Sequence, residues 1–199
     1  MTTAVPSRVR AARLVAAVLS PGVVWGAAMV LGAATASSGA RALAWGIGAA
    51  VLICLVPWLI VTKLDRDGQL RQGIRRFGLT PLVVCAGALM YGTLRAIRWL
   101  DGPLSLAAVI FAACAGLGAV LLLSRVVRLG WPAVSCGAMA AILPLMLGLP
   151  GLAAWPAAAA GLWAQHVLGR GTAAVLAGSA LAGAAVCGGT YALLLQAVR

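Results

Sequence analysis

The sequence predicts an all-α polytopic membrane protein, with residues 1–199 forming a single transmembrane domain, a bundle of six or seven spanning helices. Hydrophobic residues make up 63% of the chain and charged residues only 9%, whereas soluble domains carry roughly 25% charged residues. The apolar residues are gathered in blocks, most of them close to the about 20 residues that a helix needs to cross a hydrocarbon core of about 30 Å. The basic residues stand at the ends of these blocks.

Seven apolar blocks give the expected helices in chain order, at roughly 14–35, 43–62, 79–97, 104–124, 131–149, 152–168 and 173–198. The first block is longer than the apolar region of about 7–15 residues in a signal peptide, so we expect it to remain as the first helix. Only Pro150 and Gly151 separate the short sixth block from the fifth, which predicts a tight helical hairpin. The short block leaves the number of spans at six or seven.

Prolines and small residues should shape how these helices pack. A proline inside a helix is expected to kink it and to free a carbonyl that neighbouring helices satisfy. Such kinks are expected at Pro21, Pro57, Pro144 and Pro156. Small residues spaced four apart let helix backbones approach closely. The last block carries such a face with Ser179, Gly183 and Cys187. We expect this face to pack within the chain's own bundle, with a homodimer seam as the alternative.

The basic residues predict the orientation in the membrane, because cytoplasmic loops carry an excess of lysine and arginine. With seven helices, four basic residues fall on one side: Arg41, Arg95, Arg98 and Arg199. The other eleven fall on the opposite side: Arg8, Arg10, Arg13, Lys63, Arg66, Arg71, Arg75, Arg76, Arg125, Arg128 and Arg170. We therefore expect a multi-pass protein of the cell membrane with its N-terminus in the cytoplasm. One lysine against 14 arginines, with heavy use of alanine and glycine, is typical of a GC-rich bacterial genome.

Composition argues against several classes of function. The net charge of +12 forms no basic stripe with interleaved aromatic residues, so nucleic acid is not an expected partner. The chain holds one histidine and three acids, which leaves few groups for acid–base or metal chemistry. Small apolar packing roles are expected for its unpaired cysteines: Cys54, Cys85, Cys114, Cys136 and Cys187. We expect no metal and no cofactor.

Three polar stretches contain the candidate binding and catalytic residues. The first is the loop 63–76, either a solvated loop or a phospholipid head-group site made by Arg71, Arg75 and Arg76. The others are 131–140 and 163–178. All three fall on the same predicted side of the membrane and are expected to line a common pocket.

The order and spacing of these stretches resemble the small actinobacterial membrane members of the type 2 phosphatidic acid phosphatase and haloperoxidase superfamily. The resemblance covers most of the chain and is strongest at Trp163-Ala164, Leu168-Gly169-Arg170, Thr172 and Leu176-Ala177-Gly178. Its motifs are Lys-x6-Arg-Pro, Ser-Gly-His and Ser-Arg-x5-His-x3-Asp. The resemblance implies a nucleophilic histidine in the third motif, a proton-donating histidine in the second, and arginines that hold the phosphate.

This chain departs from the pattern where the family carries its chemistry. Gly137 stands at the histidine of the second motif, and Gln165 and Gly171 stand at the arginine and the nucleophilic histidine of the third. Val175 stands where an acid would orient that nucleophile, and the first motif has arginines but no Arg-Pro. A phosphohistidine mechanism therefore has no nucleophile, and we expect no catalysis by that route.

The resulting hypothesis is a catalytically inactive relative of the lipid phosphatases. Arg71, Arg75, Arg76 and Arg170 remain as anion-binding candidates for a phospholipid or polyprenyl phosphate, or the chain acts as a partner subunit of another membrane protein. One alternative is a displaced active site that uses His166, Ser135 or Cys136, although a lone histidine near a helix end is more often an interfacial hydrogen-bonding residue. Another is an unrelated transporter subunit or assembly factor.

Overall fold

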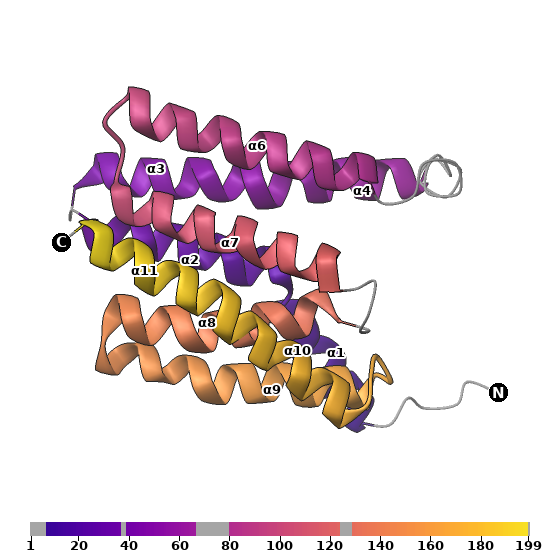
Figure 1. Cartoon of the computed structure of the whole chain (residues 1–199). Helices are drawn as coiled ribbons and strands as arrows, with labels where there is room; N and C mark the ends of the chain where they lie inside the picture. Colours follow the sequence, from indigo (N-terminus) through magenta and orange to yellow (C-terminus); the bar gives the residue numbers. More distant parts are fainter. Residues whose placement is uncertain (1–6, 37–38, 67–79, 124–128, 199) are drawn as a thin grey trace. The chain divides into compact units, whose positions relative to one another are not determined.

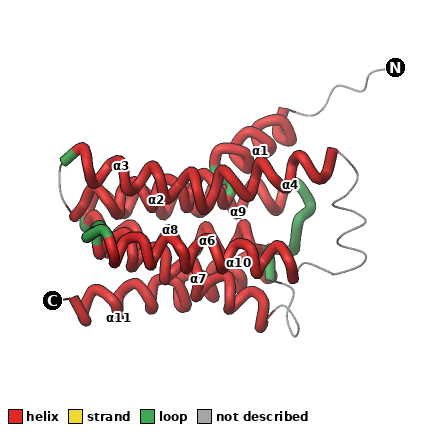
Figure 2. The backbone as a smooth tube through the Cα atoms, turned by 90° about the horizontal axis from the view of Figure 1, so that it is seen from above, coloured by secondary structure: helices red, strands yellow, loops and turns green. Residues whose placement is uncertain are grey.

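The computed structural model describes residues 7–36, 39–66, 80–123 and 129–198, and within these ranges the chain forms helices and short connections without strands (Figure 2). The all-α prediction is confirmed for this part of the chain. Two compact units emerge: unit 1 comprises Met1–Val24 and Phe111–Arg199, and unit 2 comprises Trp25–Ile110. The single domain over 1–199 stays a prediction.

Three helical stretches are long and apolar enough to cross a membrane, namely Ala40–Lys63, Leu104–Leu123 and Ala173–Gln196. Their mean hydropathies are 2.3, 2.6 and 1.6. A fourth span is reached if the bent pair Ser7–Val18 and Pro21–Ala36 is taken as one. Among the described residues, the chain thus has the helices of a multi-pass membrane protein.

The first apolar block is not one continuous helix, which corrects the expectation for 14–35. It is divided into α1 (Ser7–Val18) and α2 (Pro21–Ala36), which meet at an angle of 41°. Pro21 has no N–H with which to continue the helix from α1, yet its fixed φ suits the first position of a new helix. The proline starts a helix here, where we expected a kink within one.

Unit 2 is centred on a long helix that contains a π-turn. α3 (Ala40–Ala50) runs into the π-helix η1 (Val51–Leu55) and then into α4 (Val56–Arg66). Pro57 lies two residues after the end of η1 and cannot donate to the carbonyl four residues earlier. The wider π-turn, in which the Val56 N–H bonds the Val51 carbonyl, lets the helix continue past the proline. α6 (Thr80–Trp99) is a further described helix that lies wholly in unit 2.

α7 (Leu104–Leu123) begins in unit 2 and continues into unit 1 at Phe111. Unit 1 contains the predicted hairpin, in which α8 (Trp131–Leu147) turns back through the 3-10 helix η2 (Leu149–Ala153) into α9 (Ala154–Val167) (Figure 1). The chain ends with α10 (Ala173–Gly183), the π-helix η3 (Ala184–Gly188) and α11 (Gly189–Val198). α10 and η3 pack along α8, so the small face of the last block is used within the chain.

The contact of α8 with α10 and η3 requires glycine at three places. A Cβ atom at Gly137 would overlap the Ala180 carbonyl, and one at Gly183 would overlap the Val134 carbonyl. At Gly188 a Cβ would stand 2.6 Å from the Ala141 methyl. Lipid tails are as apolar as the side chains, so the hydrophobic effect does not drive helices together within a membrane. Close packing of this kind is therefore a main source of helix association there.

Pro144 lies inside α8, and a side chain of the neighbouring helix replaces the backbone hydrogen bond that this proline cannot make. Because Pro144 has no N–H, the Ala140 carbonyl loses its partner four residues on. The indole Nε1–H of Trp155, in the first turn of α9, donates to that carbonyl at 2.9 Å. The hairpin thus satisfies the backbone group that the proline frees, as bilayer burial demands.

We predict that Gly137→Ala and Gly183→Ala each lower the stability of the protein in detergent by about 1–3 kcal/mol, the range for overpacking. Gly178→Ala is the matched control, because a Cβ at Gly178 on α10 meets nothing within 4 Å. Unfolding followed by circular dichroism should show the control at or above the wild-type midpoint. Equal midpoints for all three variants would contradict the packing role.

A double-mutant cycle tests the Trp155–Ala140 hydrogen bond. We predict that Trp155→Phe costs about 0.6–2 kcal/mol in the wild-type background, as for hydrogen bonds between membrane helices. In a Pro144→Ala background the N–H restored at position 144 bonds the Ala140 carbonyl, so Trp155→Phe should cost less there. The same cost in both backgrounds would show that the indole acts by packing alone.

Candidate functional site

The predicted site residues that the structure describes come from α8, the end of α9 and the start of α10, all in unit 1. Arg71, Arg75 and Arg76 lie outside the described residues, so their role in anion binding stays a prediction. The described residues divide into two groups. One is buried between helices, and the other lies on the turn from α9 to α10.

Gly137 belongs to the buried group and has no room for a side chain. Its Cα lies so close to the Ala180 carbonyl that even a methyl group would overlap it. A histidine at position 137 would need α8 and α10 to separate. In this packing the glycine therefore has a structural role that is independent of any lost catalytic group.

The surface beside Gly137 is apolar. A groove of about 300 Å³ runs between α8, α9, α10 and η3, and all nine residues that line it are Gly, Ala, Leu or Trp. It includes Gly137 and Ala180 but no residue of the turn that follows α9. Nothing in this groove carries a charge to hold phosphate or a group to move a proton.

Gln165 is also buried, with 4% of its surface exposed, on the side of α9 that faces α8. Its Nε2 lies 3.9 Å from the Cys136 Sγ, a weak hydrogen bond at most. Gly161, one turn earlier, leaves room for the same sulfur, because a Cβ there would stand 2.8 Å from it. Position 165 thus points into the hairpin interface.

The turn between α9 and α10 is built by helix-ending and helix-starting residues. The Arg170 N–H bonds the Gln165 carbonyl and the Gly169 N–H bonds the His166 carbonyl, both at 3.0 Å, and Gly169 has φ 68°. These two bonds with a left-handed glycine form a Schellman motif. Thr172 then caps α10 by accepting the Val175 N–H at 3.4 Å.

Much of the sequence resemblance falls on these turn residues. Leu168, Gly169, Arg170 and Thr172 lie where α9 stops and α10 starts, and Gly169 and Thr172 have direct roles in the helix caps. Their retention is explained by local backbone geometry. It gives no separate support for phosphate chemistry.

Gly171 and Val175 differ from Gly137 because there is space around them. Gly171 is half-buried, and a Cβ there would meet the flexible end of Leu176 at 3.3 Å. Val175 is half-buried in the first turn of α10. A larger side chain at Gly171 needs only a small shift of Leu176, so what this position lacks is a reactive group.

His166 and Arg170 are the exposed polar side chains of the turn. The His166 Nδ1 lies 3.4 Å from the Gly171 carbonyl oxygen, a long hydrogen bond that holds the ring against the turn. The Arg170 guanidinium has no acidic partner among the described residues. Its donors therefore remain available to an anion at the end of the bundle of unit 1.

The alternative catalytic residues are placed away from solvent. Ser135 is 1% exposed and Cys136 is 4% exposed, both inside the contact of α8 with its neighbours. Neither lies on the turn with His166. The common pocket expected from the sequence also involves loop residues outside the described ranges, so it stays a prediction. No group of three potential metal-binding side chains occurs among the described residues.

Two features of unit 1 were not found from the sequence. The groove beside Gly137 is lined mainly by alanines of α8, α9, α10 and η3. The freed carbonyl of Ala140 is matched by a tryptophan expected only as an interfacial anchor. Comparisons with family models, with curated proteins and with solved structures found no match to the chain.

Proposed function

We propose that the chain is a catalytically inactive lipid-phosphate-binding protein of the cell membrane, with the bundle of a type 2 phosphatidic acid phosphatase relative. It would have six or seven spanning helices and a cytoplasmic N-terminus. The observation that carries the inactivity is the lack of space at Gly137, where the resemblance requires a histidine. Helix packing has occupied the place of the proton donor.

Phosphate binding without turnover is supported by the chemistry that remains on the turn. Arg170 is exposed and can present several N–H donors to a phosphate. His166 is tied to the Gly171 carbonyl, and no second histidine exists to share its role. A lipid phosphate could be bound at this end of unit 1, but no residue there would break the phosphoester bond.

The alternative of a displaced active site lacks a supporting arrangement. Ser135 and Cys136 are buried, and neither they nor His166 line the groove beside Gly137. An unrelated transporter subunit has no specific support from the described helices. Its expected signature would be acids within the spanning blocks, and the sequence has none there.

We predict no phosphate release from phosphatidic acid or polyprenyl phosphate by the purified full-length protein, because the site lacks a nucleophile. Released phosphate should not exceed that from membranes carrying an empty vector. Release above this background would refute the inactive site. In that case His166→Ala, Ser135→Ala and Cys136→Ala would each be assayed, and the variant that loses activity would mark a displaced site.

Binding itself is tested on polyprenyl phosphate by native mass spectrometry in mild detergent. We predict that Arg170→Gln weakens its retention about tenfold, since charge-assisted hydrogen bonds contribute about 1.5–3 kcal/mol. Lys63→Gln is the matched control, because Lys63 is an exposed basic residue of unit 2. Unchanged retention in Arg170→Gln would remove the turn as the phosphate site.

A further inference from the structure

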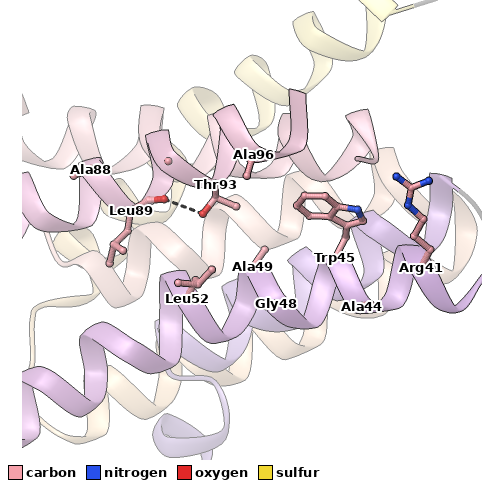
Figure 3. A pocket seen from close by; sticks show the side chains of 11 residues that line it. Arg41, Ala44, Trp45, Gly48, Ala49, Leu52, Ala88, Leu89, Thr93 and Ala96 are labelled. Atoms are coloured by element: carbon pink, nitrogen blue, oxygen red, sulfur yellow. Dashed lines mark hydrogen bonds between the residues drawn. The ribbon is translucent and has the colours of Figure 1, made fainter. Parts of the chain in front are cut away.

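Unit 2 has a larger groove that the proposed function does not use. It has a volume of about 480 Å³ and runs between α3–η1 and α6 (Figure 3). Small residues form most of its walls: Ala44, Gly48, Ala88, Gly92 and Ala96. Leu52 and Leu89 lie toward one end of it, and Trp45 and Arg41 toward the other. It is an apolar channel with one positive end.

The glycines of this groove have no packing role. A Cβ at Gly48 or Gly92 would meet nothing within 4 Å, whereas one at Gly46, two residues away on α3, would stand 2.8 Å from the Val30 Cα. Gly46 is thus needed for contact with α2. Gly48 and Gly92 instead leave open space, although glycine costs a helix about 1 kcal/mol relative to alanine.

The groove has the length of one membrane leaflet. From Arg41 to Leu52 it follows the helix for about 16 Å, at about 1.5 Å per residue. Half of a hydrocarbon core of about 30 Å is about 15 Å. Because Arg41 is the second residue of the candidate span Ala40–Lys63, the groove covers the part of this span from its first turn to its middle.

The surface end of the groove is positively charged and held in place. The Arg41 Nη2 donates to the Leu100 carbonyl at 2.7 Å, which fixes the guanidinium beside the groove and leaves its other donors available. Arg95 stacks over the Trp99 ring at 4.9 Å, and Arg98 lies in the same last turn of α6. A guanidinium presents several N–H donors in a planar fork that matches the oxygens of a phosphate group.

We infer that this groove is a binding site for an anionic glycerophospholipid, with one acyl chain between α3 and α6 and the phosphate at Arg41. The apolar walls match an acyl chain, and the length fits the chain of a single leaflet. The arginines favour a head group with net negative charge over a zwitterionic one. The site lies within unit 2 and does not depend on the turn that carries Arg170.

Native mass spectrometry of the full-length protein with added phosphatidylglycerol or phosphatidylcholine tests the site. Wild type should retain phosphatidylglycerol in preference to phosphatidylcholine. Arg41→Gln should weaken retention of phosphatidylglycerol about tenfold, the effect of losing one charge-assisted hydrogen bond. The double variant Gly48→Leu/Gly92→Leu should abolish it, because the leucines fill the groove. Its melting temperature should equal or exceed that of wild type, since leucine is the better helix former.

Gly87→Leu is the matched control for the filled groove. Gly87 is an exposed residue of α6 outside the groove, and a Cβ there also meets nothing within 4 Å. This variant and Arg170→Gln should retain phosphatidylglycerol as wild type does. Wild-type retention in the filled variant, or equal retention of the two lipids, would overturn the proposal. Loss in Arg170→Gln would place the bound lipid at the other site and also overturn it.

Discussion

Close approach between helices that have little polar surface is the constraint on which this structure depends. In lipid, apolar side chains gain nothing by leaving one hydrocarbon environment for another, so helices associate through van der Waals contact and hydrogen bonds. Gly137, Gly183 and Gly188 bring α8 against α10 and η3 at distances that no other residue permits. The hydrogen bond from Trp155 to Ala140 adds the polar counterpart in the α8–α9 hairpin.

This constraint separates two glycines that the sequence resemblance treats alike. In the sequence, Gly137 and Gly171 both stand where the resemblance expects a histidine. The structure separates them, because Gly137 is excluded from carrying a side chain while Gly171 meets only the flexible end of Leu176. A Cβ at position 137 would therefore strain the contact of α8 with α10, whereas one at position 171 would displace only the end of Leu176.

Local signals explain which parts of the fold could be predicted. The end of α9 was expected at 168 and the start of α10 at 173, and the structure has them at Val167 and Ala173. These bounds are local because Gly169 and Thr172 form the helix caps within a few residues of them. The break before Pro21 was missed, since hydropathy does not distinguish a proline that starts a helix from one that bends it. The role of Gly137 depends on Ala180, more than 40 residues later. No local pattern contains that pairing, and the same holds for Pro144 and Trp155.

The scarcity of acids leaves most basic side chains of this chain without a carboxylate of their own. With 15 basic residues and three acids, at least 12 cations in this chain have no internal carboxylate to pair with. A guanidinium at the membrane surface still requires hydrogen-bond acceptors and a counter-ion. Arg41 takes one acceptor from the Leu100 carbonyl, and its remaining donors can bond acceptors other than carboxylates of the chain. The shortage of acids that leaves few groups for acid–base chemistry therefore also leaves most guanidinium groups dependent on backbone carbonyls or on acceptors outside the chain.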